Sequence, residues 1–470
     1  MKEAKKIIIV GAGIAGKLLK NDIEKNYPEH EIIGFIDDRE KNKSESVLGG
    51  IDDLPKINDL FQVDEIVIAI PSASGEQIRK ILLKNIDNTI PVRIVPRSQR
   101  IIRQDDVKYS EVKDLDAEDF LGRPFLKKNV ETLKKFYKNK TVLITGGAGS
   151  IGSEIVRQLI DLDVKKVIVF DNSEYLTFNL DQDLKERGIS AKKYRLVIGS
   201  ILNLKKLDNL IKKEKPDIIF HAAAYKHVYL MEENIDEAVM NNIVGTKNVV
   251  DTAIKNRVRN FIFISTDKVV NPTSVMGATK KIAEYYIKGL GRSHTKFNVV
   301  RFGNVINSHG SVLPLFERQI RDHKYVTVTH KKVRRFFMSI REAAQLVINS
   351  AARDNRGEIF ILDMGELINI YEVALCLVRS KNLLPQKDVE IRIIGLKKGE
   401  KIIEELFTEK EKKNLIKTDI DNVFRLKNFE SCSSDIGHVM KDLKELISAD
   451  KNFSKTRSYL KKLFPSLLRK

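Results

Sequence analysis

The sequence has few cysteines and no long apolar run, and both absences narrow the class of protein. Only Cys376 and Cys432 occur among 470 residues. Two thiols are too few for a disulfide framework or a multi-cysteine metal site, so we expect reduced cysteines and no metal. No run approaches the roughly 18 apolar residues of a membrane span, and the start "MKEAKKIIIVGAGIAG" lacks a signal-peptide cleavage pattern. These absences predict a cytoplasmic protein.

Acidic residues are scarce relative to basic ones. Lysine and arginine number 83 against 64 acids, a formal net charge of +19. Most lysines alternate with acids along predicted helix faces, which indicates a solvated surface, and we expect no nucleic-acid partner. The tail at 454–470, "SKTRSYLKKLFPSLLRK", contains no acid. It leaves two alternatives open: peripheral association with the inner face of a membrane, or a helix packed on its own domain, which we favour.

Short runs rich in Val and Ile alternate with helical segments, a pattern that predicts parallel strands covered on both faces. The runs form two groups. The first lies at 5–11, 31–37, 64–70 and 91–96, and the second at 141–146, 165–171, 194–199, 217–223, 260–266, 297–303 and 358–363. We therefore expect an α/β protein with two doubly wound, Rossmann-like domains at 1–125 and 140–470, joined by a helical connector at 126–139.

A glycine-rich turn follows the first strand of each group. In the first, "VGAGIAGKLL", Gly11, Gly13 and Gly16 precede a helix, and Asp37 ends the next strand. This arrangement fits a dinucleotide fingerprint, in which the backbone approaches a pyrophosphate at the helix N-terminus. Such turns also serve for packing alone, so nucleotide binding by this domain stays an open alternative.

The second turn, "TGGAGSIGSE", predicts a dinucleotide site. Gly146, Gly149 and Gly152 are spaced as T-G-x-x-G-x-x-G, and Asp171 closes the next strand. An acid there accepts hydrogen bonds from the ribose hydroxyls and repels a 2′-phosphate, so NAD is favoured over NADP. We assign cofactor contacts to these four residues and to their neighbours Ser150, Ile151, Asn172 and Ser173.

Several further motifs occur in one order: "FHAAAYKHV", "MEENIDEAVMNNIVGT", "STDKVVNPTSVMGATK", "VRFGNVINSHGSVLPLF", "RRFFMSIREAAQLV" and "GLKKGEKIIEEL". With the glycine-rich turn they resemble the bacterial UDP-N-acetylglucosamine 4,6-dehydratases of polysaccharide and glycan synthesis. These are extended short-chain dehydrogenase/reductases with a small C-terminal substrate-binding part. The resemblance implies NAD as cofactor and UDP-N-acetylglucosamine as substrate, and we expect a homo-oligomer. Large members carry transmembrane helices before the first domain, so we expect a naturally soluble or a trimmed form.

The proton-handling tyrosine of short-chain dehydrogenases is missing. Such enzymes place Tyr four residues before Lys, and here Met276 precedes Lys280. A thioether cannot donate a proton and accepts one poorly. The resemblance is to the branch that carries Met at this position, in which Lys280 still holds the nicotinamide ribose and the C4 proton passes to water or to Asp267. Taken alone, a Met at this helical spacing would more often belong to the core, but the resemblance reverses this expectation and implies that Met276 belongs to the catalytic site.

The reaction implied by the resemblance oxidises C4 of the sugar, eliminates water across C5 and C6, and returns the stored hydride to C6. On this basis Thr266 binds the C4 oxygen, Asp267 protonates the C6 hydroxyl and Lys268 removes the C5 proton. Those roles require a raised pKa for Asp267 and a lowered one for Lys268. The non-catalytic alternative is that Asp267 and Lys268 form an ordinary ion pair at the protein surface, at the end of a strand.

The remaining assignments also come from the matched positions. Ser200 stands where an Asp commonly faces the adenine, and Ile201 is expected to pack on the ring. Small side chains should line the cofactor channel or pack a helix: Ala222, Ala223 and Ala224. The resemblance implies that the UDP portion contacts Asn304, Arg335 and Glu400, and leaves Lys226 and His227 open between phosphate binding and a structural role. The family's usual Arg-Pro is Lys397-Lys398 here.

Two competing functions stay open. A UDP-sugar 4-epimerase would share fold and cofactor but would normally keep the tyrosine. A non-catalytic nucleotide-sugar sensor would explain the missing tyrosine, although the intact glycines, the Thr-Asp-Lys triplet and Lys280 disfavour it. Because the matched motifs lie beyond residue 125, we also expect a chain without the first domain to keep measurable activity.

Overall fold

The computed structural model describes residues 4–39, 46–96, 107–122, 130–291, 293–353, 357–427, 435–449 and 453–468. Cys432 and the predicted boundary at residue 125 lie outside these ranges. The chain forms two compact units, each described by itself below. Unit 1 comprises Met1–Phe125, Gly310–Val333 and Ile368–Gly395, and unit 2 comprises Leu126–His309, Arg334–Leu367 and Leu396–Lys470.

The first unit contains a six-stranded sheet in the order β3-β2-β1-β4-β5-β6. The predicted runs become β1 (Lys6–Val10), β2 (Glu31–Ile36), β4 (Glu65–Ile68) and β5 (Val92–Ile94), which are parallel. Two short edge strands, β3 (Val47–Gly49) and β6 (Lys113–Asp114), complete the sheet. Helix α1 (Ile14–Asn26) packs Leu19 and Ile23 against one face of this sheet, in the same apolar cluster as Ile7 and Ile9.

Two segments from the later part of the chain belong to the same unit. They carry α14 (Val312–His323), β14 (Tyr325–Val328), α16 (Ile370–Arg379) and β18 (Glu390–Ile393), and β14 pairs with β18. Helix α16 packs against α3 (Gly75–Lys84). The fully buried guanidinium of Arg379 donates to the carbonyls of Asn85 and Ile90. The sequence prediction assigns both segments to the second domain, whereas in the structure both belong to the first compact unit. The packing of α16 against α3 and α14, together with the Arg379 bonds, holds them there.

The second unit is built on a nine-stranded sheet in the order β19-β20-β16-β12-β11-β10-β7-β8-β9. All seven predicted runs are parallel strands of this sheet: β7 (Thr141–Thr145), β8 (Lys166–Asp171), β9 (Tyr194–Ile198), β10 (Ile218–His221), β11 (Asn260–Ile264), β12 (Lys296–Arg301) and β16 (Glu358–Leu362). The antiparallel strands β20 (Val423–Leu426) and β19 (Leu415–Lys417) extend it at one edge. The predicted α/β class with two Rossmann-like sheets is therefore confirmed.

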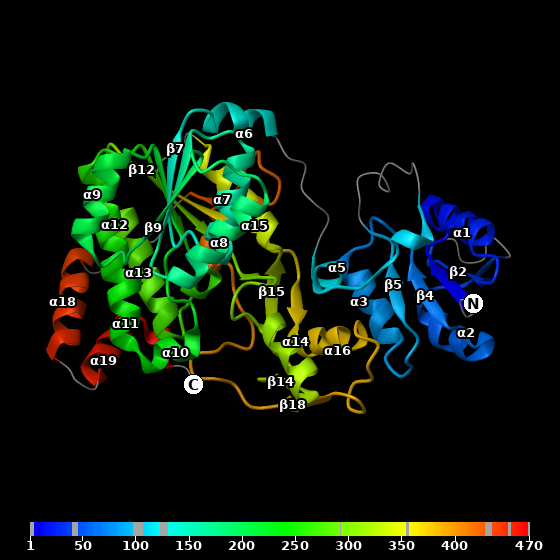
Figure 1. Cartoon of the computed structure of the whole chain (residues 1–470). Helices are drawn as coiled ribbons and strands as arrows, with labels where there is room; N and C mark the ends of the chain where they lie inside the picture. Colours follow the sequence, from blue (N-terminus) through cyan, green and yellow to red (C-terminus); the bar gives the residue numbers. More distant parts are fainter. Residues whose placement is uncertain are drawn as a thin grey trace. The chain divides into compact units, whose positions relative to one another are not determined.

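Helices cover both faces of this sheet (Figure 1). Helices α7 (Ser150–Asp161) and α15 (Ile340–Ala351) pack together on one face, and α9 (Leu204–Glu214), α12 (Thr246–Lys255) and α13 (Val275–Gly289) cover the other. The carboxyl ends of β7, β10 and β11 meet at one edge, where ligands bind in doubly wound sheets. This edge carries the glycine-rich turn and the Thr-Asp-Lys triplet.

Helices also occupy the predicted connector and the basic tail. Within the connector, α6 spans Val130–Tyr137. In the tail, α19 (Ser454–Leu463) buries Leu460, and Phe464 follows it into an apolar cluster of the second unit. Arg457 ties this helix to Glu232 with an ion pair of 2.6 Å. The tail is thus the packed helix that we favoured. Among the described helices, none combines the length and apolarity that crossing a membrane requires.

Candidate active site

The glycine-rich turn between β7 and α7 has no room for a side chain at Gly146 or Gly152. A Cβ on Gly146 would lie 2.5 Å from the Ala223 nitrogen, and one on Gly152 would lie 2.2 Å from the Gly146 oxygen. Gly146 also has a φ of +66°, which L side chains rarely adopt. Gly149 caps α7 without a side-chain hydrogen bond. The amides of the first helical turn, from Ser150 to Gly152, therefore lack helical partners and can bind an anion.

Asp171 organises the adjoining adenosine region at the end of β8. Its carboxylate accepts hydrogen bonds from the amides of Ala148 at 3.0 Å and Ser173 at 2.9 Å. Asn172 is the residue between Asp171 and Ser173. The Ser200 hydroxyl oxygen accepts a hydrogen bond from the Leu202 amide, and Ile201 is buried in the core cluster of this unit. The carboxylate thus ties the glycine-rich turn to the segment after β8.

The arrangement fits a dinucleotide. The crowded glycines keep the turn close to the strand ends, the free amides of α7 suit a pyrophosphate, and a carboxylate at Asp171 suits ribose hydroxyls rather than a phosphate. Beside the turn, Ala222, Ala223 and Ala224 directly follow β10 and are half-buried. NAD would be held by these groups.

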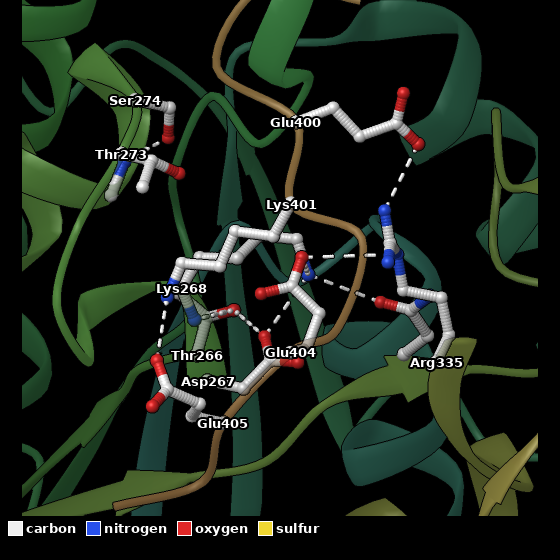
Figure 2. A network of polar contacts seen from close by, with 12 residues as sticks. Thr266, Asp267, Lys268, Thr273, Ser274, Arg335, Glu400, Lys401, Glu404 and Glu405 are labelled. Carbon is white, nitrogen blue, oxygen red and sulfur yellow. Dashed lines mark hydrogen bonds and ion pairs between the residues drawn. The ribbon is translucent and has the colours of Figure 1, made fainter. Parts of the chain in front are cut away.

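Thr266, Asp267 and Lys268 form one turn directly beyond β11 (Figure 2). Asp267 is fully buried, and its Oδ1 accepts hydrogen bonds from the Thr266 hydroxyl at 2.9 Å and from Lys268 Nζ at 3.0 Å. Its other oxygen, Oδ2, has no hydrogen-bond partner among the described residues. Asp267 and most of the Lys268 side chain are buried, which excludes the alternative of an exposed surface pair.

The sequence analysis predicted a raised pKa for Asp267 and a lowered pKa for Lys268, and the structure agrees for Asp267 only. Burial raises the pKa of Asp267, as a general acid requires. Burial alone would lower the pKa of Lys268, but the carboxylates of Asp267 and Glu404 outweigh it, so the pKa is raised. The expectation of a lowered lysine pKa is therefore wrong, because the lysine lies between two carboxylates.

The residues matched to the UDP portion also lie at this site. Arg335, on β15 (Arg334–Met338), donates through Nη2 to Glu400 Oε1 at 2.9 Å (Figure 2). Asn304 Oδ1 accepts a bond of 3.2 Å from Lys268 Nζ. Lys226 Nζ lies 3.4 Å from Ser308 Oγ and interacts electrostatically with Lys268.

His227 and Met276 have surroundings that differ from those of the reacting pair. His227 precedes α10 (Val228–Glu233), and burial together with the Lys226 charge lowers its pKa. Met276 is buried in an apolar cluster with residues of α18 (Ile436–Ala449) and α19, such as Met440 and Leu460. Its immediate surroundings are those of a core residue.

One helical turn beyond Met276, Lys280 reaches back to the sheet. Its Nζ donates a 2.7 Å hydrogen bond to the Ile264 carbonyl and lies 3.9 Å from the centre of the Phe263 ring. Burial lowers the pKa of Lys280 to about 7. This ammonium therefore lies at the end of β11, directly before the reacting triplet, where a nicotinamide ribose would contact it.

Glu404 is a site residue that the sequence reasoning missed. Its Oε1 lies 3.6 Å from Lys268 Nζ and 3.8 Å from Arg335 Nε, and the side chain is 4% exposed. Both Glu400 and Glu404 lie in the motif "GEKIIEEL", but the sequence analysis assigned a function to Glu400 only. A second Glu four residues later, beside two isoleucines, carried no separate indication of burial because the segment is neither helix nor regular strand.

Comparisons with known proteins show which families and folds this chain is similar to. Residues 142–428 match the family described as "Polysaccharide biosynthesis protein", and residues 1–96 match "CoA-binding domain". The capsular polysaccharide biosynthesis protein CapD of Staphylococcus aureus is 37% identical over 87% of this chain and 69% of its own length. A UDP-glucose 4-epimerase of Rickettsia bellii is 34% identical over 62% of this chain and 83% of its own. The X-ray structure of Pen from Bacillus thuringiensis is similar with a TM-score of 0.57 and 35% identity, covering 67% of this chain and all of Pen.

Proposed function

Because the chain belongs to the polysaccharide biosynthesis protein family, we propose that it is an NAD-dependent 4,6-dehydratase of UDP-N-acetylglucosamine that supplies a 4-keto-6-deoxy sugar for surface glycans. The observation that carries the proposal is the hydrogen bond of 3.0 Å between Asp267 and Lys268, inside a buried turn at the carboxyl end of β11. Elimination of water requires one acid and one base close together, and this pair supplies both. When bound, NAD accepts the C4 hydrogen and stores it until C6 can receive it.

The proton steps balance when Lys268 begins as the neutral amine. Thr266 Oγ1, which donates to Asp267 Oδ1, passes the C4 hydroxyl proton to that carboxylate. Lys268 then removes the C5 proton while Asp267 returns its proton to the departing C6 hydroxyl, which leaves as water. Finally the Lys268 ammonium gives the proton back to C5. The C4 hydroxyl proton thus leaves with the water, and no tyrosine is needed.

The UDP portion would be held beside this pair. Arg335 offers two guanidinium nitrogens to a diphosphate, for which bidentate pairing suits arginine. Glu400, its present partner, would be released to bind ribose hydroxyls. Proton return by the same lysine keeps both events on one face of the sugar, so we expect retention of configuration at C5.

A second candidate is a UDP-sugar 4-epimerase, favoured by the similarity to the Rickettsia bellii protein. An epimerase returns hydrogen to C4 and loses no water. Incubation with UDP-N-acetylglucosamine followed by mass spectrometry separates the two. Loss of one water supports the dehydratase, an unchanged mass with a new C4 epimer supports the epimerase, and no change with retained binding supports a sensor.

A further inference from the structure

Glu404 lies between the reacting pair and the arginine assigned to the diphosphate. Its Oε1 is within 4 Å of both Lys268 Nζ and Arg335 Nε (Figure 2). Its Oε2 is buried and has no hydrogen-bond partner among the described residues. Burying a carboxylate that leaves one oxygen without a hydrogen bond costs free energy, and nearby cations must compensate its charge. Packing alone would be served better by an apolar side chain, so the position of Glu404 between Lys268 and Arg335 requires another explanation.

Resting on the proposed dehydratase function, we propose that Glu404 is a positioning residue that holds the Lys268 amine in place for proton transfer at C5 and sets the pH at which this amine becomes available. Asp267 binds Lys268 from the preceding position in the chain, whereas Glu404 comes from a segment that is distant in sequence and reaches the same nitrogen. Two carboxylates and the Asn304 oxygen then surround the ammonium, which restricts its direction.

Other charged groups act on the same cluster and determine the sign of the effect. Arg335 and Lys226 are cations near Lys268, and Lys401 is a cation near Glu404. Burial alone would raise the pKa of Glu404, but Lys268, Arg335 and Lys401 outweigh it, so the residue is an anion at neutral pH. Removing this anion leaves Lys268 with one carboxylate and the same cations. The ammonium then loses its proton at a lower pH.

The test is the pH dependence of water loss from UDP-N-acetylglucosamine in the full-length protein. Since Lys268 must be neutral, kcat should rise with pH in the wild type. Glu404→Gln should move this rise toward acid by roughly one pH unit and lower the plateau by about tenfold or more, because the amine is less well held. The KM should change by less than about threefold, since the substitution leaves Arg335 and Glu400 in place to bind the UDP portion. Glu404→Asp keeps the charge at a longer distance and should move the profile in the same direction by less.

Glu405→Gln is the matched control. Glu405 is the next residue, is exposed and pairs with Lys401 at 3.2 Å, so its variant should keep the wild-type profile. If Glu404→Gln does not fold, Glu404→Asp decides alone. Variants that lower the melting temperature yet leave the profile and plateau unchanged show a merely structural role and overturn the inference. A wild type that loses no water overturns the proposed function and this inference together, whereas a dehydrating wild type with unmoved variant profiles overturns the inference only.

Discussion

Arg301 and Glu284 form a bidentate ion pair with both side chains excluded from solvent. Arg301 Nε and Nη2 donate to the two oxygens of Glu284 at 2.8 and 2.7 Å. Glu284 also accepts from Ser265 Oγ at 2.7 Å, and Arg301 Nη1 donates to Glu411. Ser265 directly precedes the Thr-Asp-Lys turn, and Glu284 lies one helical turn beyond Lys280. The pair therefore fixes the reacting turn against helix α13.

Breaking this pair should destabilise the second unit strongly. Arg301→Met leaves the Glu284 carboxylate buried without its main partner, so we expect a loss of about 3–5 kcal/mol in the free energy of unfolding. Urea unfolding followed by far-UV circular dichroism measures it, since the chain has no tryptophan. The control is Arg353→Met, which removes an exposed pair with Asp419 and should cost less than about 1 kcal/mol. Equal losses in the two variants would contradict the assignment.

The strands were predictable because their residues carry the signal locally. Ile7 to Val10 and Val142 to Ile144 are buried on both faces of parallel sheets, and such strands are apolar throughout. Edge strands such as β3 and β6 have two or three residues each, too few for a periodic pattern. The packing of α16 against α3 was not predictable either, because the sequence around Arg379 gives no indication that its side chain bonds to Asn85, almost three hundred positions away.

The same difference holds within the site. That Asp171 lies beside the glycine-rich turn was predictable, because both follow neighbouring strands at a local spacing. The raised pKa of Lys268 was not predictable, because it depends on the contact of Lys268 with Asp267 and on Glu404, which only the tertiary fold brings to Lys268. The direction of such a pKa shift depends on which charges lie near the group, and these are known only from the three-dimensional structure.

Asp171 should determine dinucleotide affinity and choice. In Asp171→Ala the ribose hydroxyls lose their acceptor, so NAD should bind about 10- to 100-fold more weakly by isothermal titration calorimetry. The preference for NAD over NADP should also shrink, because the repelling charge is gone. Asp163→Ala removes an exposed aspartate that pairs with Lys193 and should leave both affinities unchanged. Tighter binding of NADP than NAD by the wild type would refute the role.

Lys280 should make stability depend on pH. Its folded pKa of about 7 lies below the ordinary 10.5, so between these values the unfolded chain binds more protons. Stability then rises as pH increases from 7 to 10.5, and the full cost of the buried charge is present below pH 7. Lys280→Met removes this dependence.

Melting temperatures of both proteins, freed of bound dinucleotide, should therefore differ more at pH 7 than at pH 10. The change in the stability difference should amount to about 3–5 kcal/mol. Lys165→Met, at an exposed position, serves as the control and should parallel the wild type. A constant difference between wild type and Lys280→Met across this range would contradict the lowered pKa.

Arg379 should hold helix α16 against the end of α3 and the segment that follows it. Arg379→Met leaves the carbonyls of Asn85, Ile90 and Leu383 without this donor, which should cost about 2–4 kcal/mol locally. Hydrogen exchange followed by mass spectrometry should show faster exchange in α16, with β7 and β10 unchanged. Arg392→Met, an exposed arginine paired with Glu390, is the control. The same packing indicates that removing residues 1–125 exposes α16, so activity of that truncated chain would depend on whether this helix stays folded.

Asp267 and Lys268 should divide the acid and base work after C4 oxidation. Turnover in deuterated water should place deuterium at C5, because a lysine ammonium exchanges its protons with solvent, whereas deuterium supplied at C4 should arrive at C6 undiluted. Lys268→Met should block water loss yet allow some C4 oxidation, seen as absorbance of reduced nicotinamide. Asp267→Asn should also stop water loss, with less of that absorbance, because the C4 proton loses its acceptor at 2.9 Å from Thr266 Oγ1. Lys255→Met, which removes an exposed lysine paired with Asp208, should turn over like the wild type. Near-native turnover in both site variants, or loss of the C4 deuterium to solvent, would show that other groups move these protons.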